Sequence, residues 1–299
     1  MRIIIIGASG LIGSSLYSTA KAAGAKVVGS YNDKEQKGLI RFNMLAESIK
    51  LIISDLSKDD VVYLLSAYSN PSWIFNNQKE AQDLNIVATK RVIDDVLGIG
   101  ARLIFMSSVE VFDGKTGNYN ESSQPNPLNL YGRMKYEIEK YLSQVKGNSC
   151  IVRTGWNVGW TMENRCVIKL TYETLLKADA KMAHDNMFSI IDVRDTAEGL
   201  FRLTEHPDIK KCHLASTPPV IRTVLADSII KQSKYKDKMG YKSVSFSDIK
   251  YSEPRARLNH LDNSLSVSVL GMRYTLSDEI IQKKVELLDK NVSQLKVKL

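Results

Sequence analysis

The sequence has few cysteines, few histidines and no long apolar run. The cysteines, Cys150, Cys166 and Cys212, are too few and too scattered for a disulfide framework or a metal site. The four histidines have no metal-ligand spacing, so we expect no bound metal. The opening apolar run, MRIIII, stops at Gly7, far short of the ~20 apolar residues that a membrane span requires. These absences argue against a membrane protein and favour a cytoplasmic location.

The composition is that of an ordinary globular protein. Of the 299 residues, 43% are hydrophobic and 25% charged, and no segment has the low hydrophobicity typical of disorder. Lys and Arg number 41 against 33 acidic residues, which gives a formal net charge of +8. The basic residues are spread along the chain and do not form one stripe, so phosphate-bearing small molecules are favoured over nucleic acid as ligands.

Strand-like and helix-like segments alternate through the first half of the chain. This alternation predicts an α/β fold with a parallel, doubly wound sheet. Beyond residue 155 the regularity weakens, as expected for a smaller cap over the carboxyl edge of the sheet. The predicted strands are 2–6, 26–31, 39–42, 61–65, 102–106 and 150–153, and the predicted helices are 11–23, 45–53, 76–97 and 129–145.

A glycine-rich turn separates the first predicted strand from the first predicted helix. The spacing is G-x-x-G-x-x-G, and its strand–turn–helix setting is the one that a dinucleotide-binding loop requires. Glycine allows the backbone to approach a pyrophosphate, and a helix start offers free N–H groups and a positive dipole end. We therefore predict a Rossmann-type domain over residues 1–155, with contributions from about 186–215, and a substrate-binding cap over 156–185 and 216–299. The expected contacts to the pyrophosphate are Gly7, Ser9, Gly10, Leu11, Ile12 and Gly13.

The end of the second predicted strand bears on the choice of cofactor. Dinucleotide sites that bind NAD place an Asp or Glu there, whereas this sequence has Tyr31 followed by Asn32. Without the acid, a ribose 2′-phosphate meets no repulsion and can pair with Lys34, Lys37 or Arg41. The sequence therefore favours NADP(H) over NAD(H). The alternative is that Asp33 reaches the ribose and that the lysines belong to a solvated loop.

Three further residues have the chemistry of a carbonyl reductase. Ser108 follows the strand 102–106, and Tyr131 and Lys135 stand four residues apart on one face of a predicted helix. We expect the ammonium of Lys135 to lower the pKa of the Tyr131 phenol, which could then exchange a proton with a carbonyl oxygen. A Tyr-x-x-x-Lys spacing is common in helices, so the prediction depends on its combination with the glycine-rich loop and Ser108.

Three stretches carry a resemblance to a known family. SSVEVFDG, the segment 119–142 and IVRTGWNVG resemble the corresponding stretches of extended short-chain dehydrogenases/reductases, in particular dTDP-4-dehydrorhamnose reductases. The resemblance implies hydride transfer between NAD(P) and a keto group of a nucleotide-linked sugar, with Ser108, Tyr131 and Lys135 as the catalytic triad. A homodimer is compatible with this resemblance.

The resemblance also assigns residues around the triad. It implies that Asn85, in the predicted helix 76–97, supports a proton relay. The alternative is that Asn85 is a solvent-facing residue of that helix. On the cofactor side it implies Ser66, Ala67, Tyr68, Asn85, Ser107, Tyr131 and Lys135; on the substrate side it implies Tyr68, Ser108, Val109, Glu110, Tyr131, Trp156, Asn157, Arg222 and Arg255.

Two other functions stay open. Nucleotide-sugar dehydratases have Thr-Asp-Glu where this chain has Ser108, Val109 and Glu110, so the acid is missing, although Glu110 could serve as the base of an epimerase or dehydratase. The reductases have Thr-Asp-Tyr at this position and Arg-Pro where the chain has Arg255 and Ala256, which leaves the sugar undefined. A non-catalytic, NADP-binding regulatory protein is the second alternative, although such relatives typically lose the Tyr or Lys.

Overall fold

The main feature of the structure is a parallel sheet of seven strands in the order β11-β6-β5-β4-β1-β2-β3. The structure is a computed structural model that describes residues 1–33 and 35–295. β1 lies inside the sheet because its four isoleucines are buried on both faces. The strands are β1 (Arg2–Ile6), β2 (Val27–Tyr31), β3 (Ile40–Arg41), β4 (Asp60–Leu64), β5 (Arg102–Met106), β6 (Ser149–Thr154) and β11 (Lys211–Leu214).

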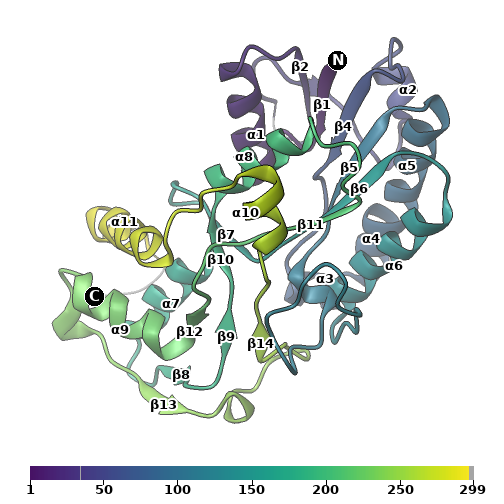
Figure 1. Ribbon diagram of the computed structural model, residues 1–299. Coiled ribbons are helices and arrows are strands. Elements are labelled where there is room, and N and C mark those ends of the chain that lie inside the picture. Colours follow the sequence, from purple (N-terminus) through teal and green to yellow (C-terminus); the bar gives the residue numbers. More distant parts are fainter. Residues whose placement is uncertain (34, 296–299) are drawn as a thin grey trace.

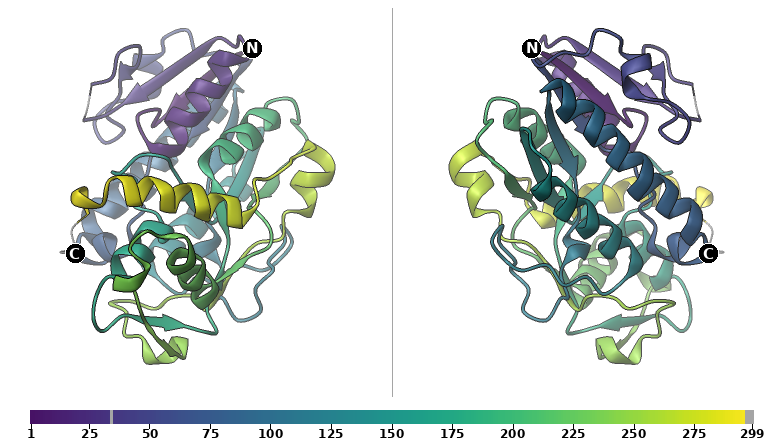
Figure 2. Two further views of the ribbon diagram at one scale, coloured as in Figure 1. Left: turned by 90° about the vertical axis from the view of Figure 1, so that its left-hand side faces the viewer. Right: turned by 90° about the vertical axis from the view of Figure 1, so that its right-hand side faces the viewer.

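Helices cover both faces of this sheet, as Figures 1 and 2 show. α1 and α8 pack together on one face, and α2, α5 and α6 contribute to the apolar cluster on the other. The two-sided cover and the strand order confirm the predicted Rossmann-type α/β fold. These helices are α1 (Leu11–Ala22), α2 (Ile49–Ile52), α5 (Thr89–Ile99), α6 (Leu130–Gln144) and α8 (Val193–Leu203).

Two predicted helices differ from those observed. The helix predicted over 45–53 is reduced to the four residues of α2. The one predicted over 76–97 corresponds to a continuous helical stretch over 78–99, made of α4 (Gln78–Gln82), a π-helical segment (Asp83–Ala88) and α5. A separate short helix, α3 (Pro71–Asn76), precedes it; Asn70 caps α3 by accepting a hydrogen bond from the Trp73 amide, and the non-helical Asn77 separates the two. The π-helical segment carries Asn85.

The second half of the chain builds the smaller part from short strands and three helices that share one apolar cluster. α10 differs: Leu270, at its end, and the following Met272 pack into the cluster of α1 and α8, against the main sheet. Among the described residues, no helix is long and apolar enough to cross a membrane. The elements are β7 (Trp156–Val158), α7 (Val167–Leu175), β8 (Lys181–Ala183), β9 (Met187–Phe188), β10 (Ile190–Asp192), β12 (Val220–Ile221), α9 (Arg222–Gln232), β13 (Lys242–Val244), β14 (Leu258–Asn259), α10 (Ser264–Leu270) and α11 (Ser277–Lys290).

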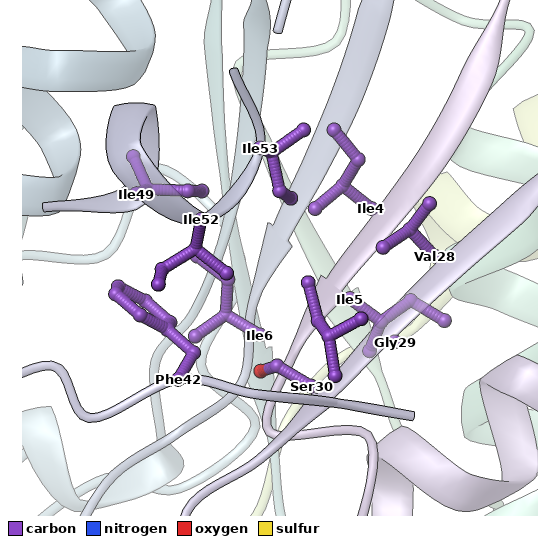
Figure 3. A pocket seen from close by; sticks show the side chains of 11 residues that line it. Ile4, Ile5, Ile6, Val28, Gly29, Ser30, Phe42, Ile49, Ile52 and Ile53 are labelled. Carbon is purple, nitrogen blue, oxygen red and sulfur yellow. The ribbon is translucent and has the colours of Figure 1, made fainter. Parts of the chain in front are cut away.

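The packing between β1, β2 and α2 leaves a void of about 10 Å³. Figure 3 shows its lining, in which Ile4, Val28 and Ile53 are typical members. Since the lining is almost wholly apolar and the void is barely large enough for one water molecule, it has no room for a ligand. In a sheet of this kind, ligands bind at the carboxyl edge of the strands.

Candidate active site

A cleft of about 510 Å³ opens at the carboxyl edge of the sheet. The glycine-rich turn, the residues after β5, the start of α6 and β7 all contribute to its wall. Parallel strands end at the same edge, so segments distant in sequence converge there. Of the residues predicted for the site, those that line this cleft are Gly7, Gly10, Leu11, Ile12, Gly13, Ala67, Ser107, Ser108, Val109, Glu110, Tyr131, Lys135, Trp156, Asn157 and Arg255.

The glycine-rich turn has the geometry of an anion cradle. Gly7 adopts a φ of +89°, which favours glycine, and the Gly10 amide donates to its carbonyl oxygen at 3.0 Å. A Cβ on Gly13 would lie 2.1 Å from the same oxygen, so α1 packs directly on the turn. α1 starts without a side-chain cap and without an acid in its first turn. The first amides of α1 and its dipole can therefore receive the pyrophosphate of a dinucleotide.

Tyr131 lies at the start of α6 and is buried, with 9% of its surface exposed. Burial raises the pKa of its phenol; the neighbouring Ser108 hydroxyl acts in the opposite direction and the charge of Glu110 adds to the increase. The expected lowering of this pKa by Lys135 is therefore wrong for the structure, because desolvation is the largest effect. Tyr131 is a protonated phenol at neutral pH, the form that donates a proton.

Lys135 follows Tyr131 by one helical turn, and its Nζ lies 5.9 Å from the centre of the Tyr131 ring. The Nζ donates a hydrogen bond to the Met106 carbonyl oxygen at 2.7 Å. Burial lowers the pKa of Lys135 to about 8, while the charge of Glu139 raises it. The side chain is therefore mainly an ammonium at neutral pH and loses its proton in the mildly alkaline range.

Glu110 has a fixed position at the back of the cleft. The Asn129 side-chain amide donates to one carboxylate oxygen at 2.6 Å, and that of Asn259 donates to the other at 2.9 Å. Asn129 also caps α6, because its side-chain Oδ1 accepts a hydrogen bond from the Gly132 amide at 2.9 Å. A Cβ on Gly132 would lie 2.0 Å from the Glu110 carbonyl oxygen, so the helix start touches the backbone of the turn after β5. Hydrogen bonds to both oxygens hold the carboxylate of Glu110 in one orientation.

A second pocket of about 360 Å³ adjoins the cleft and shares Glu110, Trp156, Arg165 and Arg255 with it. Arg222 reaches this pocket from the start of α9 and donates to Thr171 Oγ1 at 3.1 Å. Its guanidinium lies 4.4 Å from the centre of the Phe188 ring. Burial lowers the pKa of Arg222 to about 10, and no carboxylate among the described residues pairs with it. A partly buried guanidinium without a carboxylate partner, at the wall of a pocket, can bind an anionic ligand.

Several predicted residues lie outside both cavities. Asn85 is buried, so the alternative that it faces solvent is wrong; its amide exchanges two hydrogen bonds with the Tyr68 backbone, at 3.0 and 2.9 Å. Asn85 thus fixes the segment after β4 without lining the cleft. Lys34 lies outside the described residues. The predicted residues that line neither cavity are Ser9, Tyr31, Asn32, Ser66, Tyr68 and Asn85.

Part of both walls is formed by residues that the sequence did not indicate. Asn164 and Arg165 line the cleft from the loop before α7, where Asn164 Oδ1 accepts from the Gly159 amide at 2.8 Å. Phe246 and Tyr251, whose ring centres are 5.4 Å apart, line the second pocket. These residues follow no recognisable spacing, and only the fold of the cap brings them together.

The family described as the RmlD substrate binding domain matches residues 1–284. The chain belongs to this family. Subunit beta of methionine adenosyltransferase 2 from Xenopus tropicalis is 31% identical over 217 residues, which cover 70% of this chain and 65% of that protein. The dTDP-4-dehydrorhamnose reductase of Aggregatibacter actinomycetemcomitans is 26% identical over 159 residues, 53% of this chain and 52% of that enzyme. The chain thus spans less than two thirds of the length of these relatives.

Several solved structures share the fold over nearly the whole chain. A hypothetical dTDP-4-dehydrorhamnose reductase from Sulfolobus tokodaii has a TM-score of 0.76 at 25% identity, over 94% of this chain and 99% of that one. The Bacillus anthracis enzyme, solved in complex with NADP, has a TM-score of 0.78 at 20% identity, over 96% and 98%. MoeE5, solved with UDP-glucose and NAD, has 0.79 at 19%, over 98% and 100%. The last two likenesses concern the fold alone.

Proposed function

We propose that the protein reduces a keto group on a nucleotide-linked deoxysugar, with NAD(P)H as hydride donor. The observation that carries this proposal is the convergence of Ser108, Tyr131 and Lys135 in one cleft with the glycine-rich turn. A nicotinamide dinucleotide would lie with its pyrophosphate on the first amides of α1, and when bound it would supply the hydride. The neighbouring pocket, with its unpaired Arg222, suits the diphosphate of the substrate.

Each member of the triad has a distinct task in this reaction. The hydroxyl of Ser108 holds the carbonyl oxygen of the substrate, and the Tyr131 phenol gives that oxygen its proton. Burial keeps the phenol protonated, which suits reduction better than the reverse oxidation. Lys135, held by the Met106 carbonyl at 2.7 Å, keeps a positive charge near the site as negative charge develops on the oxygen.

We propose NADPH as the preferred cofactor. The register of the sheet supports this choice, because Arg41 on β3 is the direct partner of Tyr31 on β2. Arg41 is exposed and can pair with a 2′-phosphate, whereas exposed Asp33 opposes one. Calorimetric titration with NADPH and NADH measures the two affinities, and tighter binding of NADH would contradict the proposed preference for NADPH.

Glu110 favours a second candidate, an epimerase or dehydratase on the same fold. Its carboxylate lines both cavities, is held at both oxygens and could accept a proton from a sugar carbon. Glu110→Gln separates the two candidates: a reductase should keep most of its activity, whereas an enzyme that uses Glu110 as a base should lose it.

The deciding experiment measures NADPH consumption with dTDP- and UDP-linked 4-keto-6-deoxy sugars, together with product analysis for epimers. Tyr131→Phe removes one hydroxyl and almost no volume, so it should leave the fold and the affinity for NADPH intact. It should lower turnover by ~10²-fold or more, the magnitude of a lost general acid. If the wild type binds NADPH but turns over no keto sugar, the non-catalytic regulatory alternative moves ahead. One relative, subunit beta of methionine adenosyltransferase 2, is by its name one subunit of a larger assembly, which makes a partner protein the next thing to test.

A further inference from the structure

A buried ion pair lies directly behind the candidate active site. Glu139, on α6, accepts two hydrogen bonds from the Arg153 guanidinium of β6, at 2.9 and 2.6 Å. Glu139 is 4% and Arg153 1% exposed. Removing two opposite charges from water is costly, and hydrophobic pairs of similar size often stabilise a fold as well or better. This cost makes a purely structural role a poor explanation for the pair.

The pair is joined to the cleft through Ser107. The Ser107 hydroxyl donates to Glu139 Oε1 at 2.5 Å, and its amide donates to the Val152 carbonyl of β6 at 2.7 Å. Ser107 immediately precedes Ser108, and Lys135 donates to the carbonyl of the residue before it, Met106. The end of β5 is therefore held from both sides at the point where it presents the Ser108 hydroxyl.

The charge of Glu139 also acts on Lys135. The two side chains stand four residues apart on α6, and the negative charge of Glu139 opposes the effect of burial on the Lys135 ammonium. His213 on β11 faces the ion pair, with its Nε2 3.3 Å from Arg153 Nη1. Glu121 is a further acidic residue beside this group, and its carboxylate accepts a hydrogen bond from the His213 backbone amide at 2.8 Å.

We propose that Glu139 is a positioning residue for the proton transfer, which acts through Ser107 on the end of β5 and through its charge on the ammonium of Lys135. The proposal rests on the proposed reductase function. It gives the ion pair a role that an apolar pair could not replace, since neither an acceptor for Ser107 nor a negative charge near Lys135 would remain.

The test measures the ionisation of Lys135 without cofactor or substrate. Trace labelling with acetic anhydride across a pH series, read peptide by peptide by mass spectrometry, gives the pH at which half of the Lys135 amine is free. We expect this midpoint near 8 in the wild type and about one unit lower in Glu139→Gln, since an unprotonated amine is favoured once the negative charge is gone. Ser107→Ala keeps that charge, so it should leave the midpoint unchanged while lowering kcat.

The alkaline limb of the kcat profile of Glu139→Gln should move to lower pH together with the midpoint. If the single variant does not fold, the double variant Glu139→Gln/Arg153→Met removes both charges of the pair, and its Lys135 midpoint should also fall, by less than in Glu139→Gln because the positive charge of Arg153 is lost as well. An unchanged midpoint in a folded Glu139 variant, or an equal change in Ser107→Ala, would overturn the proposal. A wild type without turnover that still shows the expected midpoints would instead count against the reductase function, so the two failures can be told apart.

Discussion

The buried ring of His213 makes a quantitative prediction about acid stability. Burial, reinforced by the charge of Arg153, lowers its pKa from 6.5 to about 3. The ring has a defined tautomer, because Arg153 can only donate to Nε2 and the Tyr119 carbonyl can only accept from Nδ1, at 3.0 Å. The folded protein therefore keeps this ring neutral at pH values where the unfolded chain protonates it.

The sign and size of the effect follow from proton linkage. The stability associated with the neutral ring is complete above pH 6.5 and is lost progressively as the pH falls toward 3. Between pH 7.5 and pH 5 the unfolded chain gains nearly one proton at this position. At about 1.4 kcal/mol per pH unit over about 1.5 units, the free energy of unfolding should fall by about 2 kcal/mol.

Urea denaturation at pH 7.5 and pH 5 measures this loss, and two variants isolate it. His213→Gln keeps an acceptor for Arg153, and His213→Asn keeps a donor for the Tyr119 carbonyl, but neither side chain titrates. Both variants should be less stable than the wild type at pH 7.5. Both should also lose about 2 kcal/mol less than the wild type on acidification. If all three proteins lost the same amount, the assignment of a neutral, buried His213 would be refuted.

Two further predictions concern the ligand sites. Gly10→Val should fold, since a Cβ there meets only the Gly7 carbonyl oxygen, at 3.3 Å. Its side chain would occupy the pyrophosphate cradle, so calorimetry should show no NADPH binding. Gly13→Val, whose Cβ would lie 2.1 Å from the same oxygen, should instead unfold at a lower temperature than the wild type. Arg222→Gln should weaken binding of dTDP or UDP by roughly ten- to hundredfold and leave NADPH affinity unchanged, because a hydrogen bond to a charged group is worth about 1.5–3 kcal/mol.

The sheet could be predicted closely because its signals are local. β1 and β5 begin and end at the predicted residues, and α1 ends one residue earlier than predicted. Buried strands are continuous apolar runs, and glycine marks the turn between β1 and α1, so neighbouring residues carry the information.

The cap and the electrostatics of the site could not be predicted in the same way. β8, β9 and β14 are two or three residues long and pair across large gaps in sequence, so no periodicity identifies them. The pKa of Tyr131 depends on how much water the folded chain removes, which the Tyr-x-x-x-Lys spacing does not contain. Asn85 lies in a π-helical segment and is buried against the Tyr68 backbone, a contact between residues 17 apart that helical periodicity does not reveal.

The contact between Gly132 and the Glu110 carbonyl oxygen sets a limit on how the site can change. The two backbones are in van der Waals contact there, with no room for a Cβ. This contact fixes the distance between Tyr131 and the turn that carries Ser108. Side chains of the cap can be exchanged without altering that distance. New sugars could therefore be accommodated by substitutions around Arg222 and Tyr251, while the spacing between proton donor and carbonyl holder stays as it is.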